Sequence, residues 1–144
     1  MNTPAVPQVI AASVVSEDKR LDFLPAFFGP SLMLYGEALV YKWMGRLSPH
    51  HYSGGLWQFH TLSNGGYYMA PTRPERLHLS VTGNGFDGFM SADAAGVVAT
   101  LFALGQLAAT ECEPARDRFV ELYHALRDFV GDHAEAAFIF RAID

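Results

Sequence analysis

Two carboxylates in one glycine-rich stretch are the side chains of this sequence that best fit metal or acid–base chemistry. Asp87 and Asp93 lie between Gly83 and an apolar run at residues 94–110. Paired carboxylates can hold a hard cation, or can act as a general acid and base. The same residues can instead hold the local backbone, with Asp87 accepting from turn amides and Asp93 capping a helix. We favour this second interpretation.

The six histidines do not have the spacing of a metal site. His50 and His51 are adjacent, so they cannot share a helical face, and the other four are scattered without a ligand-spaced partner. No HExxH or CxxC pattern is present. We therefore expect no bound metal and no cofactor.

Two further catalytic patterns are incomplete. Gly83, Gly85 and Gly88 match the start of a dinucleotide fingerprint, but no βαβ unit with a following acidic residue surrounds them. Ser91 lies in no GxSxG elbow and has no base at a recognisable offset. The sequence thus favours a protein that is not an enzyme.

These residues are positioned by the stretch 84–107, a contorted loop that runs into the most apolar helix of the chain. Residues 94–110 contain no charge, so a helix there must be surrounded by protein. Ser91 is its expected N-cap, and Asp93 adds negative charge near the positive end of the helix dipole. The run is short of the ~20 residues that a bilayer requires, which indicates a core helix and no membrane span.

The clearest β signal is a hairpin at Ser63-Asn64-Gly65-Gly66, between apolar runs at 56–62 and 67–70. Asn-Gly predicts a two-residue type I′ turn. Pairing residue 63 with 66 would place Leu62 opposite Tyr67 and His60 opposite Met69. A third strand at 76–81 would complete an antiparallel meander. The other face of the hairpin would then hold Trp57, Phe59, Thr61, Tyr68 and Ala70.

Helical patterns flank this sheet on both sides. We expect a helix after Ser16 that Pro25 kinks or divides, a core helix from Gly29-Pro30 to Ser48-Pro49, and another from residue 114 to Gly131. Asp132 and Glu135 have the spacing of a capping box for a short last helix. The predicted fold is α+β: one compact domain at 16–144, with a small antiparallel, about three-stranded sheet packed with four to five helices. Residues 1–15 form a flexible N-terminal arm or an added edge element.

Charge and cysteine content narrow the function further. The net charge is −5, from 15 acidic and 10 basic residues, and no Lys/Arg stripe is present. Direct high-affinity DNA binding is therefore not expected, and the acidic excess is too small to imitate duplex DNA. The single cysteine, Cys112, fits a reducing compartment, so we expect a cytoplasmic protein.

Four stretches in register resemble the ArdB/KlcA antirestriction family: YSGGLWQFHTLSNGGYYMAP, NGFDGFMSADAAGVVATLFAL, FVELYHALRDFVGDHAE and AAFIFRAID. The resemblance runs from about Ser16 to Asp144. It implies a compact α+β domain encoded on plasmids or other mobile elements, which protects incoming plasmid or phage DNA from type I restriction systems. It also implies no established catalytic residues, and a mechanism different from that of the strongly acidic DNA mimics.

The resulting hypothesis is an inhibitor that contacts a type I restriction–modification enzyme complex. The alternatives are a metal-dependent hydrolase or nuclease that uses Asp87 and Asp93, and a DNA-binding accessory protein. The sequence does not indicate an oligomeric state. Candidate contact residues, chosen for loop position and chemistry, are Trp57, Asn64, Tyr67, Tyr68, Phe86, Asp87 and Asp93.

Overall fold

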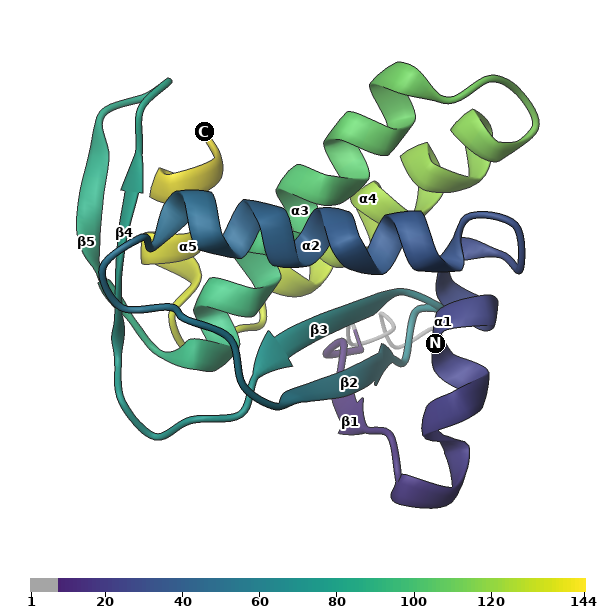
Figure 1. Ribbon diagram of the computed structural model, residues 1–144, viewed down its shortest axis with the longest axis horizontal. Helices are drawn as coiled ribbons and strands as arrows, with labels where there is room; N and C mark the ends of the chain where they lie inside the picture. Colours follow the sequence, from purple (N-terminus) through teal and green to yellow (C-terminus); the bar gives the residue numbers. More distant parts are fainter. Residues whose placement is uncertain (1–7) are drawn as a thin grey trace, which may run out of the picture.

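The computed structural model describes residues 8–144 and has an α+β architecture, as predicted (Figure 1). Its described part contains five α-helices and two small antiparallel sheets in one compact domain. The elements are β1 (Ala12–Val14), the 3-10 turn η1 (Glu17–Lys19), α1 (Arg20–Phe28), α2 (Met33–Leu47), β2 (Trp57–Leu62), β3 (Tyr67–Pro71), β4 (Leu77–Val81), β5 (Phe86–Met90), α3 (Ala92–Thr110), α4 (Ala115–Val130) and α5 (Ala136–Ile143).

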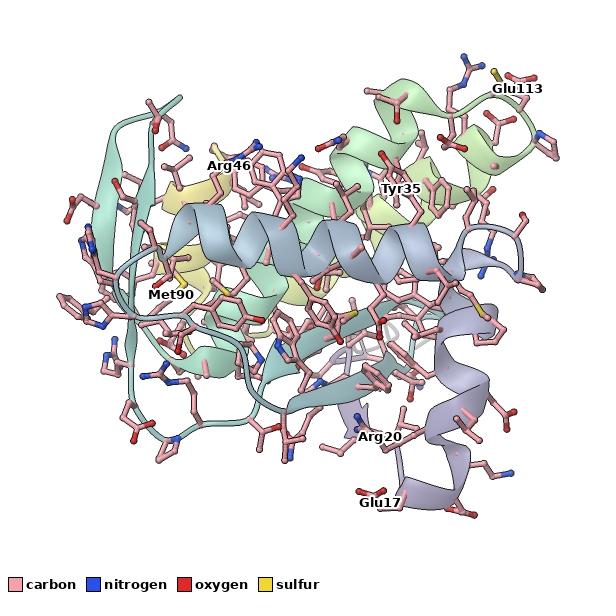
Figure 2. All side chains as sticks on the ribbon, in the orientation of Figure 1. Glu17, Arg20, Tyr35, Arg46, Met90 and Glu113 are labelled. Carbon is pink, nitrogen blue, oxygen red and sulfur yellow. The ribbon has the colours of Figure 1, made fainter. Side chains whose placement is uncertain are left out.

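The helix α2 runs across the molecule, from α1 at one end to the β4–β5 ribbon at the other (Figure 1). It buries Gly36, Leu39, Val40, Met44 and Leu47. The helical spacing of Leu32, Tyr35 and Leu39 predicts that Tyr35 also belongs to the buried apolar stripe, but Tyr35 is 46% exposed; Figure 2 labels it beside α2. The buried stripe is therefore narrower than expected.

Proline 25 does not divide the first helix. Helix α1 continues through it to Phe28. Proline leaves the carbonyl of Leu21 without an intrahelical donor. Leu21 is 92% exposed, so water can reach its surroundings and the helix tolerates the missing bond.

The first sheet has the strand order β1-β2-β3, and its hairpin register is shifted by one residue from the expected pairing. His60 pairs with Tyr68 and Phe59 with Met69. The turn has three residues, 63–65: the Leu62 amide donates to the Gly66 carbonyl and the Gly65 amide donates to the Leu62 carbonyl, with Gly65 at a φ of 87°. A shift of one residue exchanges the faces of a strand. His60 therefore shares its face with Tyr68 and Ala70, and not with Met69.

Aromatic side chains cover both faces of this sheet. On one face, Phe23 of α1 stacks on Phe59 with ring centroids 4.3 Å apart. On the other, Tyr68 stacks on Phe129 of α4 at 5.6 Å. Residues 12–14, within the segment expected to be an arm, form the edge strand β1, and the first seven residues of that segment lie outside the described residues.

The strand β4 does not extend the hairpin into a meander, contrary to the prediction. It pairs with β5, which occupies the stretch expected to be a glycine-rich loop. The two-residue period of β5 is visible in its burial, because Phe86 and Met90 are buried while Asp87 and Phe89 are exposed. The alternation cannot be recognised in the sequence, because the central residue of β5 is Gly88, which has no side chain.

Helix α3 lies at the centre of the domain. By length and composition it could cross a membrane, but 67% of its most apolar window is buried within the protein, as expected for a core helix. It packs directly on β3: the Thr100 hydroxyl donates to the Met69 carbonyl and lies 3.4 Å from the Met69 amide. Gly96 permits this approach, because a Cβ added there would lie 2.3 Å from the Cβ of Ala70.

Replacing Gly96 by alanine is expected to destabilise the domain, because the added methyl meets the backbone of β3 as well as the Ala70 side chain. Overpacking of a core costs about 1–3 kcal/mol, and here it outweighs the gain in helix propensity of about 1 kcal/mol. Gly45→Ala in α2 is the matched control, since a Cβ there has no neighbour within 4 Å. Urea unfolding should show Gly96→Ala less stable and Gly45→Ala more stable than the parent chain.

Candidate functional site

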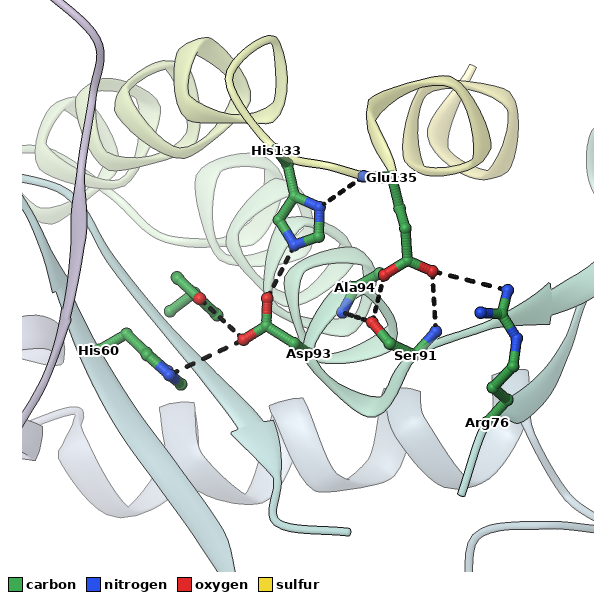
Figure 3. A network of polar contacts seen from close by, with 8 residues as sticks. His60, Arg76, Ser91, Asp93, Ala94, His133 and Glu135 are labelled. Atoms are coloured by element: carbon green, nitrogen blue, oxygen red, sulfur yellow. Dashed lines mark hydrogen bonds and ion pairs between the residues drawn. The ribbon is translucent and has the colours of Figure 1, made fainter. Parts of the chain in front are cut away.

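The carboxylate of Asp93 is the centre of a polar network at the start of α3 (Figure 3). Tyr68 donates its hydroxyl hydrogen to Asp93 Oδ1 at 2.9 Å, and Nε2 of His133 lies 2.7 Å from Asp93 Oδ2. The expected cap is provided by Ser91 alone, whose hydroxyl accepts from the Ala94 amide at 3.1 Å. Asp93 therefore turns away from the free amides of its helix, which corrects the capping role predicted for its side chain.

The tautomer of His133 follows from its second nitrogen. The backbone amide of Glu135 donates to His133 Nδ1 at 2.9 Å. Because Nδ1 accepts this bond, the ring proton lies on Nε2, where it is donated to Asp93. His133 thus holds the carboxylate as a neutral hydrogen-bond donor.

His60 is the third neighbour of the carboxylate and is only 5% exposed. Its ring stacks on Tyr68 with centroids 4.2 Å apart and planes 2° from parallel, and its Nε2 lies 3.8 Å from Asp93 Oδ1. Its Nδ1 has no hydrogen-bond partner among the described residues. The stacking depends on the observed hairpin register, which places His60 and Tyr68 side by side.

Burial and hydrogen bonding set the charge states of this network. Burial alone would raise the pKa of Asp93, but the hydrogen bonds from His133 and Tyr68 outweigh it, so the pKa lies below its ordinary value. Burial lowers the pKa of His60 despite the nearby Asp93 charge. Burial and Asp93 together raise the pKa of the Tyr68 phenol. At neutral pH the group is therefore one carboxylate among neutral partners.

A second carboxylate, that of Glu135, joins the loop between α4 and α5 to the start of α3. Glu135 accepts from the Ser91 amide at 2.9 Å and from the Ser91 hydroxyl, and its Oε1 lies 3.7 Å from Nη2 of Arg76. Figure 3 shows these contacts beside the Asp93 group. The predicted capping box at Asp132 and Glu135 is therefore absent: Glu135 binds Ser91, while Asp132 accepts from the Ile10 amide.

Asp87 is not part of the Asp93 network. It lies on β5 with its side chain 69% exposed, and its Oδ1 is 2.8 Å from Nε2 of His78. Asp87 thus contacts His78 in place of the turn amides that the sequence predicted as its partners. The two carboxylates contact different histidines, His78 at Asp87 and His133 with His60 at Asp93. Residues 8–144 contain no group of three or more His, Cys, Asp or Glu side chains that could hold a metal ion.

The other candidate contact residues have structural roles within the chain. Trp57 and Phe86 are each 5% exposed, and Trp57 donates to the Tyr52 hydroxyl. Asn64 joins the hairpin to α4 by donating to the Ala125 carbonyl at 2.8 Å. Tyr67 is half-buried and stacks on Phe27 at 5.2 Å. Asp87 and the open side of Asp93 are the charged candidates that reach solvent.

Asp93→Asn is expected to destabilise the protein more than Asp87→Asn does. Each change removes an acid that faces a histidine. Asp93 also accepts a hydrogen bond from the Tyr68 hydroxyl and is partly buried. Hydrogen bonds to charged groups contribute about 1.5–3 kcal/mol each, and less where water reaches them as it does at Asp93, whereas an exposed ion pair contributes about 0–1 kcal/mol. Urea unfolding of both variants at neutral pH measures the difference. Equal losses would contradict a structural role specific to Asp93.

His60 should make the protein less stable as the pH falls below about 6.5, its ordinary pKa. The folded state lowers this pKa, so the unfolded chain binds more protons below that value and gains free energy from them. The contribution of Asp93 is present above its ordinary pKa of 3.8 and is lost only as the pH falls through its lower folded value.

The check is urea unfolding of the parent chain and His60→Phe roughly between pH 5 and 8, where histidine changes charge. Phenylalanine keeps the stacking on Tyr68 and removes the titration. The stability difference between the two proteins should therefore be constant above about pH 6.5 and should change in favour of His60→Phe below it. Parallel curves across the whole range would exclude His60 as the source.

The chain is similar to known proteins of one family. A protein-family model described as "Antirestriction protein" matches residues 50–144. The antirestriction protein KlcA of Escherichia coli is 57% identical over 145 residues, which cover all of both chains. The uncharacterised protein YafX of E. coli strain K12 is 39% identical over 140 residues, covering 94% of this chain and 88% of the relative.

A solved structure has the same fold. It comes from work on the KlcA and ArdB proteins, described as showing a novel fold and antirestriction activity against type I DNA restriction systems in vivo but not in vitro. That chain is 56% identical to this one, with all of both chains covered and a TM-score of 0.88. The family match covers most of this chain and includes the loop, helix and hairpin of the Asp93 network. The chain therefore belongs to the antirestriction protein family.

Proposed function

We propose that this protein protects incoming plasmid or phage DNA from type I restriction by contacting a protein of the restriction–modification complex. The observation that carries the proposal is the full-length similarity to KlcA, at 57% identity, together with the TM-score of 0.88 to a relative described as active against type I systems. A match over the whole chain includes the surface as well as the core.

Its charge supports protein contact over contact with DNA. The net charge of −5 does not favour binding to phosphates, and 15 acidic against 10 basic residues do not reproduce the charge density of a duplex. The acids that reach solvent beside β5 and α3 are paired with histidines. Such isolated carboxylates suit a protein surface with matching donors.

Binding, and not catalysis, is the proposed mode of action, and the cytoplasm is the proposed place. The polar network at α3 has an arrangement that serves packing: Ser91 is bonded to a carboxylate, and His133 donates to one. No histidine in these contacts accepts from a hydroxyl that could act as a nucleophile. The solved relative's activity in vivo but not in vitro favours testing the chain in cells, where every component of the restriction pathway is present.

The experiment is phage plating on cells that carry a type I system, with and without this chain. Unmodified phage should plate on expressing cells at an efficiency close to that on restriction-deficient cells. Fully modified phage on the same cells is the control, and its plating should not change. Unchanged restriction in several type I hosts that contain the folded protein would overturn the proposal.

A further inference from the structure

The negative charge of Asp93 is stabilised by hydrogen bonds from neutral groups and is not neutralised by a neighbouring cation among the described residues. The hydrogen-bond donors to its carboxylate are the Tyr68 phenol and His133, whose Nδ1 accepts from a backbone amide. Within residues 8–144, the basic nitrogens that lie within 4.0 Å of this carboxylate belong to His60 and His133, and to no lysine or arginine. An ionised carboxylate offers about four acceptor sites, of which these two donors occupy two.

Asp93 lines a pocket. The side chain is 43% exposed, and it lines a hollow of about 290 Å³ at the junction of β2, β3 and α3. Ala70, Pro71 and Ala92 give the pocket an apolar floor, while Gln58 and Thr72 add polar groups at its rim. The pocket therefore combines a preoriented charge with a surface that can bury methylene groups.

Arg73 lines the same pocket but is engaged elsewhere. Its Nη1 donates to the His51 carbonyl at 2.6 Å, and its Nε lies 3.5 Å from Glu75 Oε2. Glu75 offsets the charge of Arg73, so this wall of the pocket is close to neutral. The charge of Asp93, which lines the same pocket, has no such offset from a lysine or arginine within 4.0 Å among residues 8–144.

The geometry points to this pocket as a receptor for a cationic group, an arginine side chain of a protein partner, held by the free acceptor sites of Asp93. Arginine fits better than lysine, because its planar guanidinium can donate to Asp93 and to the Gln58 or Thr72 side chain at once. Its three methylene groups would lie over Ala70 and Ala92. The identity of the partner rests on the proposed function, whereas the binding of the cationic group does not.

The binding test uses amide chemical shifts of the full chain. The probe is Nα-acetyl-arginine N-methylamide, and the matched control is its citrulline analogue, which has the same shape without the charge. The arginine probe should produce saturable shifts at residues 58, 70, 72, 73, 92 and 93, and the citrulline analogue should produce none. Equal shifts with both compounds, or shifts spread over all surface acids, would overturn the inference.

Three variants locate the contact. Asp93→Asn should abolish the saturable shifts, while Asp87→Asn, which removes an exposed acid paired with a histidine, should leave them unchanged. Gln58→Arg places a guanidinium on the exposed rim of the pocket and should occupy Asp93 from within the chain. It leaves Tyr68 and His133 intact, so it tests the pocket even if Asp93→Asn is poorly folded. Retained probe binding in Gln58→Arg would contradict the assignment.

Phage plating with Gln58→Arg tests the source of the arginine. Loss of protection in a folded variant that no longer binds the probe supports a partner arginine. Full protection in that variant would contradict the proposal that a partner protein supplies the arginine. A small cationic molecule would then be the ligand. If the parent chain itself gives no protection, the proposed function fails alone, and the chemical-shift result still decides whether the pocket binds a cation.

Discussion

Close contact between α3 and the edge of β3 is the constraint on which the other packing depends. Gly96 leaves no side chain between the two backbones, and Thr100 bonds to the Met69 carbonyl. This contact covers a strand edge that would otherwise present free backbone groups. It also fixes the start of α3 over β3, so that Asp93, one turn before Gly96, lies above Tyr68. The polar site is a consequence of core packing.

The network around Asp93 differs electrically from the other carboxylate contacts of the chain. Glu135 has Arg76 nearby at 3.7 Å, and Asp87 is exposed to water beside His78. Asp93 is partly buried, receives hydrogen bonds from neutral groups and remains ionised, since those bonds lower its pKa against the effect of burial. Hydrogen bonds can stabilise a charge without cancelling it. The field of Asp93 therefore extends into its pocket.

Much of the fold was predictable from local signals, and the errors have physical causes. The core helices, the Ser91 cap and the position of the hairpin follow from periodicity, capping and turn chemistry. The register was ambiguous because Gly65 takes a positive φ in a two-residue turn and also in the three-residue turn observed. The site was harder to predict. The sequence indicates Asp93 as a candidate residue. Its partners Tyr68 and His133 are 25 and 40 residues away along the chain, and no sequence motif links the three.

A single preoriented carboxylate also accounts for how a weakly acidic protein can be selective. An exposed acid such as Asp87 must be ordered when it binds, and salt screens its charge. Asp93 is already held by Tyr68 and His133, so a cation that enters the pocket gains a fixed acceptor without that ordering cost. A rigid pocket discriminates between donors by shape, whereas a field of many charges attracts any polycation. Recognition of this kind needs one acid in the right place, which is compatible with a net charge of only −5.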